Sequence, residues 1–470
     1  MAGWDSLQRL VKEEVIQRRD EGCNTEGFIE KIEAAGNDRE QLMAIYEQLM
    51  RLPIRPDFPF AEPSELDEIR KKRPEGPRVL QPQHSEPVWR DKFYGAWLGR
   101  SVGCALGKPL EQWEYMGGSF GNPGWKNVQL WFQGADAWPI TTYVPAQSRA
   151  QKEVGLNIAN VSPKSLRENI CYMESDDDIR YTVLGLIMLE EKGLEWDSWD
   201  VGLLWHRVLS YSQVCTAETQ AYLNFAQVTS HLNNLLKNEG NARNSDWEEQ
   251  KAWVRTYLNP YREWIGAQIR ADGLAYGAAG KPELAAELAW RDASFSHVKN
   301  GIYGEMFVAA MIAAAFSERD PERIVEIGLS EIPATSRLAK DVREAVAIAR
   351  STKNQVELVD RIWEAFKHYN PVHTNNNAAL VAASLIFGQG NFEKAITTAV
   401  LGGWDTDCNG ATVGSIMGAM LGAEAVPSSW TAPLNDILYA EINGFHPIPI
   451  SECAARSFEV FKKLNPDSCC

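Results

Sequence analysis

Segments that would place the chain in a membrane are missing from the sequence. The longest apolar run, MFVAAMIAAAF at residues 306–316, has eleven residues, whereas a helix that crosses the roughly 30 Å hydrocarbon core needs about 20. The opening MAGWDSLQRLVKEEV also lacks the apolar core of a signal peptide. We therefore expect a cytoplasmic protein without a membrane partner.

Cysteine and histidine patterns typical of zinc sites are also missing. The eight cysteines form no C-x-x-C pair, and the seven histidines show no zinc-ligand spacing. In a reducing compartment these cysteines are expected to be free thiols. Cys469 and Cys470, adjacent in the tail, are expected to be reactive rather than functional.

Positive charge is in short supply. The chain has 47 Lys and Arg against 63 Asp and Glu, which gives a net charge of −16. Nucleic acids and anionic membranes require clustered Lys and Arg, so the composition disfavours both as partners. The negative net charge does not exclude a small anionic substrate, because a bound metal ion can make the local electrostatic potential positive. The sequence gives no indication of the oligomeric state.

Alternating β-branched runs are scarce, and helical spacing recurs instead, for example at residues 176–193, 281–293 and 301–316. Amphipathic helices are expected before residue 50, whereas residues 51–87 contain eight of the 23 prolines. We therefore predict an all-α protein in two parts. Residues 1–87 form an N-terminal helical extension with a proline-rich connector, and residues 88–470 form the main domain.

The segment GGWDTDCNG, residues 402–410, resembles the first half of an EF-hand loop. An EF-hand needs a bidentate carboxylate at its twelfth position. Counted from Asp405, that position is Ile416, and the ninth is Val413. The EF-hand interpretation therefore fails. A helix starts at once, and its glycines at 410, 414, 418 and 422 predict the close approach of another helix.

A second acidic cluster opens another helix, in ESDDDIRYTVLGLIMLEE at residues 174–191. Ser175 and Asp178 fit an ordinary capping box, and Asp405 alone fits an ordinary cap. Three consecutive carboxylates exceed what a cap needs, and no neutralising partner is evident. Two helix starts rich in hard oxygen ligands are thus expected to face each other around Mg²⁺ or Mn²⁺.

Four segments, in order, resemble the motifs of the ADP-ribosylglycohydrolase superfamily. They are FYGAWLGRSVGCALGKPLE at 93–111, SDDD at 175–178, SHVKNGIYGEMFVAA at 296–310 and GGWDTDCNGATVGSIMGAMLGA at 402–423. The resemblance implies a compact all-α bundle with a binuclear site for two divalent cations, Mg²⁺ first, with Mn²⁺ or Ca²⁺ as alternatives. It says nothing about residues 1–87.

The resemblance also implies which residues form the site. The implied metal ligands are Ser175, Asp176, Asp177, Asp405 and Asp407, with Asp178, Cys408 and Asn409 as further candidates. The candidate catalytic carboxylates are Glu111, whose alternative is a solvent-facing helix residue, and Asp177. The candidate substrate contacts are His297, Gly266, Arg270 and Trp404, although His297 and Trp404 are equally expected to serve in packing.

The chain departs from the family pattern at several of these positions. Cys104 stands where the first motif usually has Asp, and Cys408 stands where the last motif has Thr. A thiol is a poor Mg²⁺ ligand, so one of the two ions is expected to bind more weakly. The stretch WIGAQIRADGLAYG, residues 264–277, keeps Gly266 and Arg270 of a phosphate-binding loop, but Ile265 replaces a polar residue.

Three functions stay open at this point. The first is a hydrolase that cleaves the N-glycosidic bond of an ADP-ribosyl conjugate. The second is a hydrolase of an N-ribosyl bond in a small nucleoside or nucleotide of a biosynthetic pathway. The third is a non-catalytic binding or structural protein of the same fold, because a fold does not establish an activity.

Overall fold

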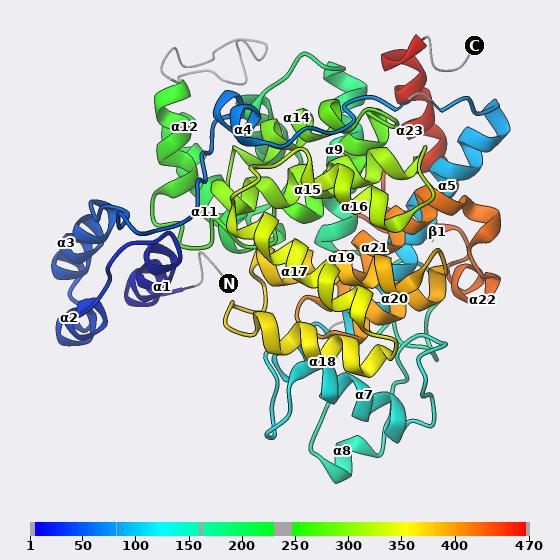
Figure 1. Ribbon diagram of the computed structural model, residues 1–470, viewed down its shortest axis with the longest axis horizontal. Coiled ribbons are helices and arrows are strands. Elements are labelled where there is room, and N and C mark those ends of the chain that lie inside the picture. Colours follow the sequence, from blue (N-terminus) through cyan, green and yellow to red (C-terminus); the bar gives the residue numbers. More distant parts are fainter. Residues whose placement is uncertain (1–4, 81, 159–162, 230–246, 467–470) are drawn as a thin grey trace.

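The computed structural model describes residues 5–80, 82–158, 163–229 and 247–466. Within these ranges the chain forms 23 α-helices and one two-stranded antiparallel sheet, β1 (Ile437–Leu438) with β2 (Ile448–Pro449) (Figure 1). The predicted all-α fold is confirmed. Among the helices of the described ranges, none has the length and hydrophobicity that a membrane span requires.

Three helices at the N-terminus form a separate small unit, which projects from the left of the molecule in Figure 1: α1 (Leu7–Asp20), α2 (Phe28–Ala35) and α3 (Arg39–Met50). Their apolar faces meet in a hydrophobic cluster that includes Val11, Ile32 and Leu42. Ser6 and Asp38 cap α1 and α3, because their side-chain oxygens accept backbone N–H groups. The unit therefore has a core of its own.

Buried ion pairs attach this unit to the rest of the chain. The Arg262 guanidinium donates to both oxygens of Glu14 in α1, at 2.7 and 2.8 Å, and lies 3.2 Å from Glu21. Gln17 donates to Glu263 at 2.8 Å. These side chains are almost fully excluded from solvent. Glu21 also pairs with Arg18 and Lys299, whereas Arg262 is the one ion-pair partner of Glu14 among the described residues.

We expect Arg262→Met to lower the free energy of unfolding by at least about 3 kcal/mol, because Glu14 would stay buried without its cation. Urea unfolding of the full chain measures this loss. Arg51→Met is the control, since Arg51 and its partner Glu47 are 80 % and 61 % exposed and such pairs contribute about 0–1 kcal/mol. Equal effects of the two substitutions would contradict the docking role of Arg262.

The proline-rich connector follows the surface of the main body and includes α4 (Leu66–Lys72) (Figure 1). Arg78 lies 2.7 Å from the buried carboxylate of Glu331, and the Leu80 N–H donates to the Gly280 carbonyl at 2.7 Å. The connector is thus extended but docked. The division of the chain at residue 87 stays a prediction.

Two antiparallel helices at the centre of the molecule approach each other unusually closely: α5 (Glu86–Gly107) and α21 (Thr406–Leu421). Glycines recur every four residues on both helices, and the two glycine rows face each other. A Cβ on Gly99 or Gly103 would overlap the carbonyl of Gly414 or Gly410. The close approach predicted from the α21 glycines is confirmed, and it brings the end of α5 against the start of α21.

Gly103→Ala is expected to destabilise the protein by about 3 kcal/mol, because the new methyl group meets a backbone carbonyl that cannot rotate away. The urea midpoint of unfolding measures the change. Gly390→Ala is the control: Gly390 has φ +78°, but no atom lies within 4 Å of its Cβ position, so only about 1 kcal/mol of backbone strain applies. A milder effect at Gly103 than at Gly390 would be inconsistent with this packing.

The remaining inner helices are enclosed by other helices to different extents. Every residue of α19 is buried, and all but the first of α15. This inner group consists of α9 (Asp177–Lys192), α13 (Ala271–Gly277), α15 (Lys299–Ala315), α19 (Thr374–Gly388), α20 (Phe392–Leu401) and α23 (Ile450–Leu464).

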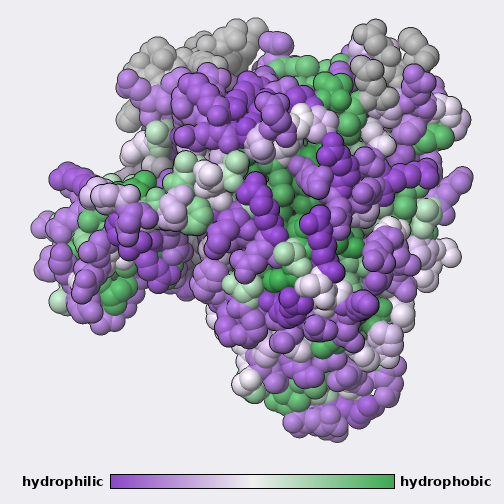
Figure 2. Space-filling view, in the orientation of Figure 1, coloured by the Kyte–Doolittle hydropathy of each residue, from purple (hydrophilic) through white to green (hydrophobic). Residues whose placement is uncertain are grey.

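The other helices lie around this group. They are α6 (Trp113–Met116), α7 (Gly124–Gly134), α8 (Ala150–Glu153), α10 (Ser198–Val208), α11 (Thr216–Thr229), α12 (Trp247–Thr256), α14 (Pro282–Ala293), α16 (Pro321–Leu329), α17 (Arg337–Ser351), α18 (Gln355–Phe366) and α22 (Ser428–Thr431). Figure 2 shows hydrophilic residues over most of the visible face. The six cysteines of the described ranges are free thiols, as expected, and Cys469 and Cys470 lie outside those ranges.

Candidate functional site

The two acidic clusters lie at the N-termini of α9 and α21, where unpaired backbone N–H groups favour carboxylates. Asp176 caps α9, because its Oδ1 accepts the Asp178 N–H at 2.9 Å. Asp405 is the residue before α21. The Thr406 hydroxyl donates to the Gly107 carbonyl at 2.9 Å, which fixes the start of α21 to the end of α5.

The structure brings the two clusters together at the end of α5. Ligand atoms of Cys104, Asp176, Asp178 and Asp407 lie within 4.8 Å of one another, and we call these residues the first set. Asp405, Asp407 and Cys408 meet the same limit and form the second set. Asp407 belongs to both sets, so the sets are adjacent. Of the four aspartates predicted to converge, Asp176 and Asp405 each lie in a set with Asp407, whereas Asp177 belongs to neither set.

Several buried oxygens in these sets, and one on the neighbouring Asn409, have no hydrogen-bond partner. They are Oδ2 of Asp178 and Oδ1 of Asp405, Asp407 and Asn409. Buried polar atoms are nearly always paired. A group of buried acceptors without partners therefore indicates a site for a cation. Burial, followed by the charge of Asp176, raises the pKa of Asp407 to about 7. A hard divalent cation fits this donor set.

Asn377 of α19 orients the second set, and sequence reasoning missed it. Its Nδ2 donates to the carbonyls of Pro371 and His373, both at 2.8 Å. Its Oδ1 therefore faces the site, where it accepts the Asn409 amide at 2.7 Å and the Asp405 N–H at 3.3 Å. Because the amide nitrogen of Asn409 donates to Asn377, the Oδ1 of Asn409 is the atom that remains without a partner.

Two cations neutralise the first set, which corrects the expectation that the acidic clusters have no such partner. The Lys108 ammonium donates to Oδ2 of Asp176, and Arg100 donates to Asp178 at 2.9 Å while lying 2.8 Å from Asp272. Burial alone would lower the pKa of Lys108, but Asp176 outweighs it and raises that pKa above its ordinary value. Lys108 lies one helical turn after Cys104, and residues with this spacing share a face of the helix. The spacing could therefore have indicated that Lys108 lies near the site.

Glu111 follows the short 3₁₀ turn Lys108–Leu110 that continues α5. Burial and the charges of Asp407 and Asp405 raise its pKa well above the ordinary range. The residue as a whole is exposed, and the negative charges of Asp407 and Asp405 disfavour ionisation of its carboxyl group. Glu111 is thus a carboxyl group that combines access to solvent with closeness to the acidic sets.

Two other predicted residues lie beside the sets rather than within them. Asp177 is half-buried and belongs to neither set; burial, then Asp176, raises its pKa to about 6. The Ser175 hydroxyl accepts a hydrogen bond from Arg180 at 3.2 Å, and Arg180 also donates to Glu441 at 2.9 Å. Metal ligation by Ser175 and Asp177 stays a prediction.

The predicted phosphate-binding residues have other partners. The Arg270 side chain is 2 % exposed and lies 2.6 Å from Glu218 and 3.7 Å from Glu305, and it also pairs with Asp292. The Glu218 carboxylate fills the space above Gly266, where a Cβ would overlap it. This geometry does not favour a substrate role for Arg270 or Gly266.

His297 and Trp404 also face inward. The His297 ring is fully buried, with Nδ1 at 2.8 Å from the Ser296 hydroxyl, and burial lowers its pKa well below the ordinary value. Trp404 is 2 % exposed and stacks on Trp363, with ring centroids 5.2 Å apart. Both contacts fit a role in packing, the alternative to substrate binding. Substrate binding by His297 or Trp404 stays a prediction, which this geometry does not favour.

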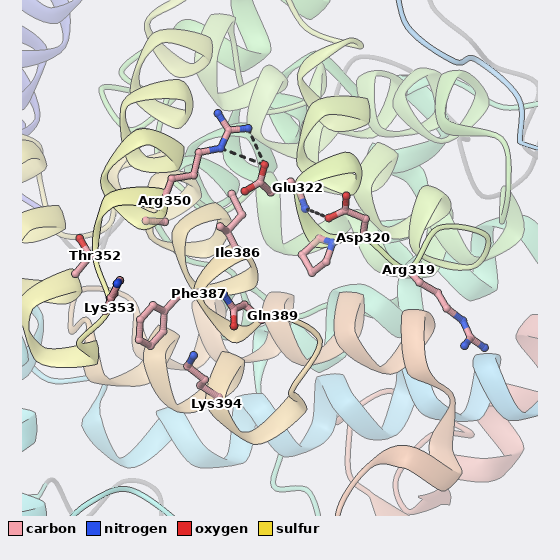
Figure 3. Close-up of a pocket in the computed structure, with 12 residues that line it drawn as sticks. Arg319, Asp320, Glu322, Arg350, Thr352, Lys353, Ile386, Phe387, Gln389 and Lys394 are labelled. Atoms are coloured by element: carbon pink, nitrogen blue, oxygen red, sulfur yellow. Dashed lines mark hydrogen bonds and ion pairs between the residues drawn. The ribbon is translucent and has the colours of Figure 1, made fainter.

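A surface cavity of about 760 Å³ has no residue of the acidic sets in its lining (Figure 3). It is lined by residues of α16, α17, α19 and α20, and its Arg350 donates to Glu322 at 2.7 Å. Phe387 in this cavity and Asn377 at the second set are ten residues apart on α19, which is about 15 Å along a helix. This cavity is therefore separate from the acidic sets.

Comparisons with known proteins identify the family of the chain. The family model described as ADP-ribosylglycohydrolase matches residues 85–461. A solved structure described as an ADP-ribosylglycohydrolase-related protein complex is 18 % identical, covers 80 % of this chain and 99 % of its own, and has a TM-score of 0.48, a similarity too distant to support an argument. No curated protein matched the chain. Because the family model covers most of its length and all four motifs, the chain belongs to the ADP-ribosylglycohydrolase family.

Proposed function

We propose that the protein is a divalent-metal-dependent hydrolase that cleaves the N-glycosidic bond between ribose and its aglycone in an ADP-ribosyl conjugate. Membership of the ADP-ribosylglycohydrolase family supports hydrolysis at this type of bond. The observation that carries the metal dependence is the group of unpaired, buried oxygens on Asp178, Asp405, Asp407 and Asn409.

These residues would hold a divalent cation through hard oxygen donors, which Mg²⁺ and Mn²⁺ prefer. When bound, such a cation orients the ribose hydroxyls and lowers the pKa of a water molecule. The helix starts of α9 and α21 keep the carboxylates in place, because the capping contacts and the Asn377 amide restrict them. The site is thus rigid before the substrate arrives.

Glu111 would act as the general base. A water molecule attacks the anomeric carbon of the ribose, the bond from that carbon to the aglycone nitrogen breaks, and the Glu111 carboxylate accepts the proton of the water. The leaving nitrogen then takes up a proton. Asp177, half-buried beside the sets, is the second candidate for this role. The negative charge of the site also stabilises the oxocarbenium-like transition state, which carries positive charge.

A small N-riboside is the second candidate substrate, and two observations favour it. Three carboxylates engage Arg270, and Glu218 fills the space above Gly266, so these residues offer little to a pyrophosphate. Trp404 is buried, as are Trp125 and Trp131, whereas Trp113, two residues after Glu111, is 66 % exposed. An aromatic aglycone could stack on its indole.

A substrate panel tests the proposal. Purified protein with Mg²⁺ is incubated with ADP-ribosyl-arginine, other ADP-ribosyl conjugates and simple N-ribosides, and free ribose or ADP-ribose is quantified by chromatography. We expect release from at least one member, and its identity decides between the two substrate classes. Binding without release for every member would favour the non-catalytic alternative and contradict the proposed hydrolysis.

A further inference from the structure

We propose that the Lys108 ammonium takes the place of one of the two cations for which the acidic helix starts provide ligands, so that the protein binds a single divalent ion. This inference deepens the proposed function and relies on it for the presence of a metal. It changes the number of ions, from the two that the family resemblance implies to one.

The argument starts from the two ligand sets. The first set (Cys104, Asp176, Asp178 and Asp407) and the second set (Asp405, Asp407 and Cys408) share Asp407. Each set could surround one cation, and a shared carboxylate could bridge the two positions. The chain therefore has the outline of a binuclear site, with one position on each side of Asp407.

Protein groups already engage Asp176 and one oxygen of Asp178 at the first position, whereas Oδ2 of Asp178 is unpaired. Asp176 accepts the Asp178 N–H with Oδ1 and the Lys108 ammonium with Oδ2, so neither of its oxygens is left without a partner. Arg100 donates to Oδ1 of Asp178. The Lys108 side chain is 13 % exposed, which means that it is enclosed in the site rather than extended into solvent.

Charge leads to the same conclusion. The three carboxylates of the first set face two protein cations, Lys108 and Arg100. A divalent ion added here would meet the ammonium within the same small space, where charges interact strongly because water is excluded. Cys104 adds a thiol, which is a poor ligand for Mg²⁺. The second set contains a thiol as well, Cys408, so it is the two protein cations that make the first position the less favourable one for an ion.

The second position lacks such a partner. Within the described residues, no Lys, Arg or His forms an ion pair with Asp405 or Asp407, and Oδ1 of each is unpaired. The unpaired Oδ1 of Asn409 lies on the same turn of α21 and adds a neutral oxygen donor. The single ion is therefore expected at Asp405 and Asp407, with Lys108 as a fixed positive charge beside it.

Metal counting tests this inference independently of activity. The wild-type protein and Lys108→Met are stripped with chelator, titrated with Mn²⁺ by calorimetry, and assayed for bound metal by mass spectrometry. We expect one Mn²⁺ per wild-type chain and two per Lys108→Met chain, with the spectrum of a spin-coupled Mn²⁺ pair only in the variant. Lys152→Met is the control, because Lys152 is exposed on α8, and it should bind one ion.

Two Mn²⁺ ions in the wild-type protein would overturn the inference, as would a folded Lys108→Met that still binds one. If Lys108→Met does not fold, a second pair of variants decides. Asp176→Asn should keep one ion at near wild-type affinity, whereas Asp405→Asn should weaken binding by at least about 10-fold; the reverse order would overturn the inference. A wild-type protein that binds one ion but cleaves no substrate refutes only the proposed hydrolysis.

Discussion

Asp407→Asn should abolish turnover and weaken metal binding more than any other single substitution in the site. Asp407 is the only residue that belongs to both ligand sets, and its Oδ1 has no partner among the described residues. Asparagine keeps the size of the side chain but removes its charge, so the main electrostatic attraction for the cation is lost. Substitution of a residue that only supports the metal ligands typically lowers metal affinity by roughly 10- to 100-fold. Loss of Asp407, a proposed metal ligand, should lower the affinity by more than this.

Calorimetric titration with Mg²⁺ and Mn²⁺, together with hydrolysis of the best substrate, measures the effect of Asp407→Asn. Excess metal should restore part of the turnover, because the fold and Glu111 are unchanged. Asp136→Asn provides the control, since Asp136 is 77 % exposed and pairs with Arg149 at the surface. Hydrolysis by Asp407→Asn at the wild-type rate would remove Asp407 from the mechanism.

Glu111→Gln should lower kcat by about 10²–10⁴, the typical contribution of a general base. Metal and substrate should still bind, because Asp405 and Asp407 remain and glutamine occupies the same volume as glutamate. This separation of binding from turnover is the signature of a lost proton acceptor. A variant that had only lost its fold or its metal would not bind the substrate.

Single-turnover kinetics and metal titration of Glu111→Gln are compared with those of Glu114→Gln. Glu114 is three residues away on α6 and is half-buried, so it controls for a charge change in the same segment. Full activity of Glu111→Gln would refute its role as the base and leave Asp177 as the next carboxylate to substitute.

The sequence was sufficient for features that depend on local spacing. Helical periodicity predicted the all-α fold, and glycines at every fourth position predicted the close packing of α21 against a partner helix. The apolar residues Val413 and Ile416 excluded an EF-hand, and two acidic helix starts predicted the meeting of Asp176 and Asp407. The first three of these inferences used the spacing of residues within one segment, whereas the last joined two segments far apart in the sequence through the metal-binding chemistry that they share.

The sequence was not sufficient for contacts between distant segments. Arg270 and Glu218 are 52 residues apart, and Lys108 and Asp176 are 68 apart. Which cation meets which carboxylate depends on the packing of whole helices, so spacing alone left the acidic clusters without partners. The same limit applies to Asn377, whose role depends on the positions of α19 and α21.

The metal dependence of hydrolysis by the wild-type protein tests the central claim most directly. The protein is stripped with chelator, its metal content is measured, and cleavage of the best substrate of the panel is followed while Mg²⁺ or Mn²⁺ is added back. The account predicts background hydrolysis in the stripped protein and recovery in proportion to bound metal. Undiminished hydrolysis by protein shown to be free of divalent metal would contradict it.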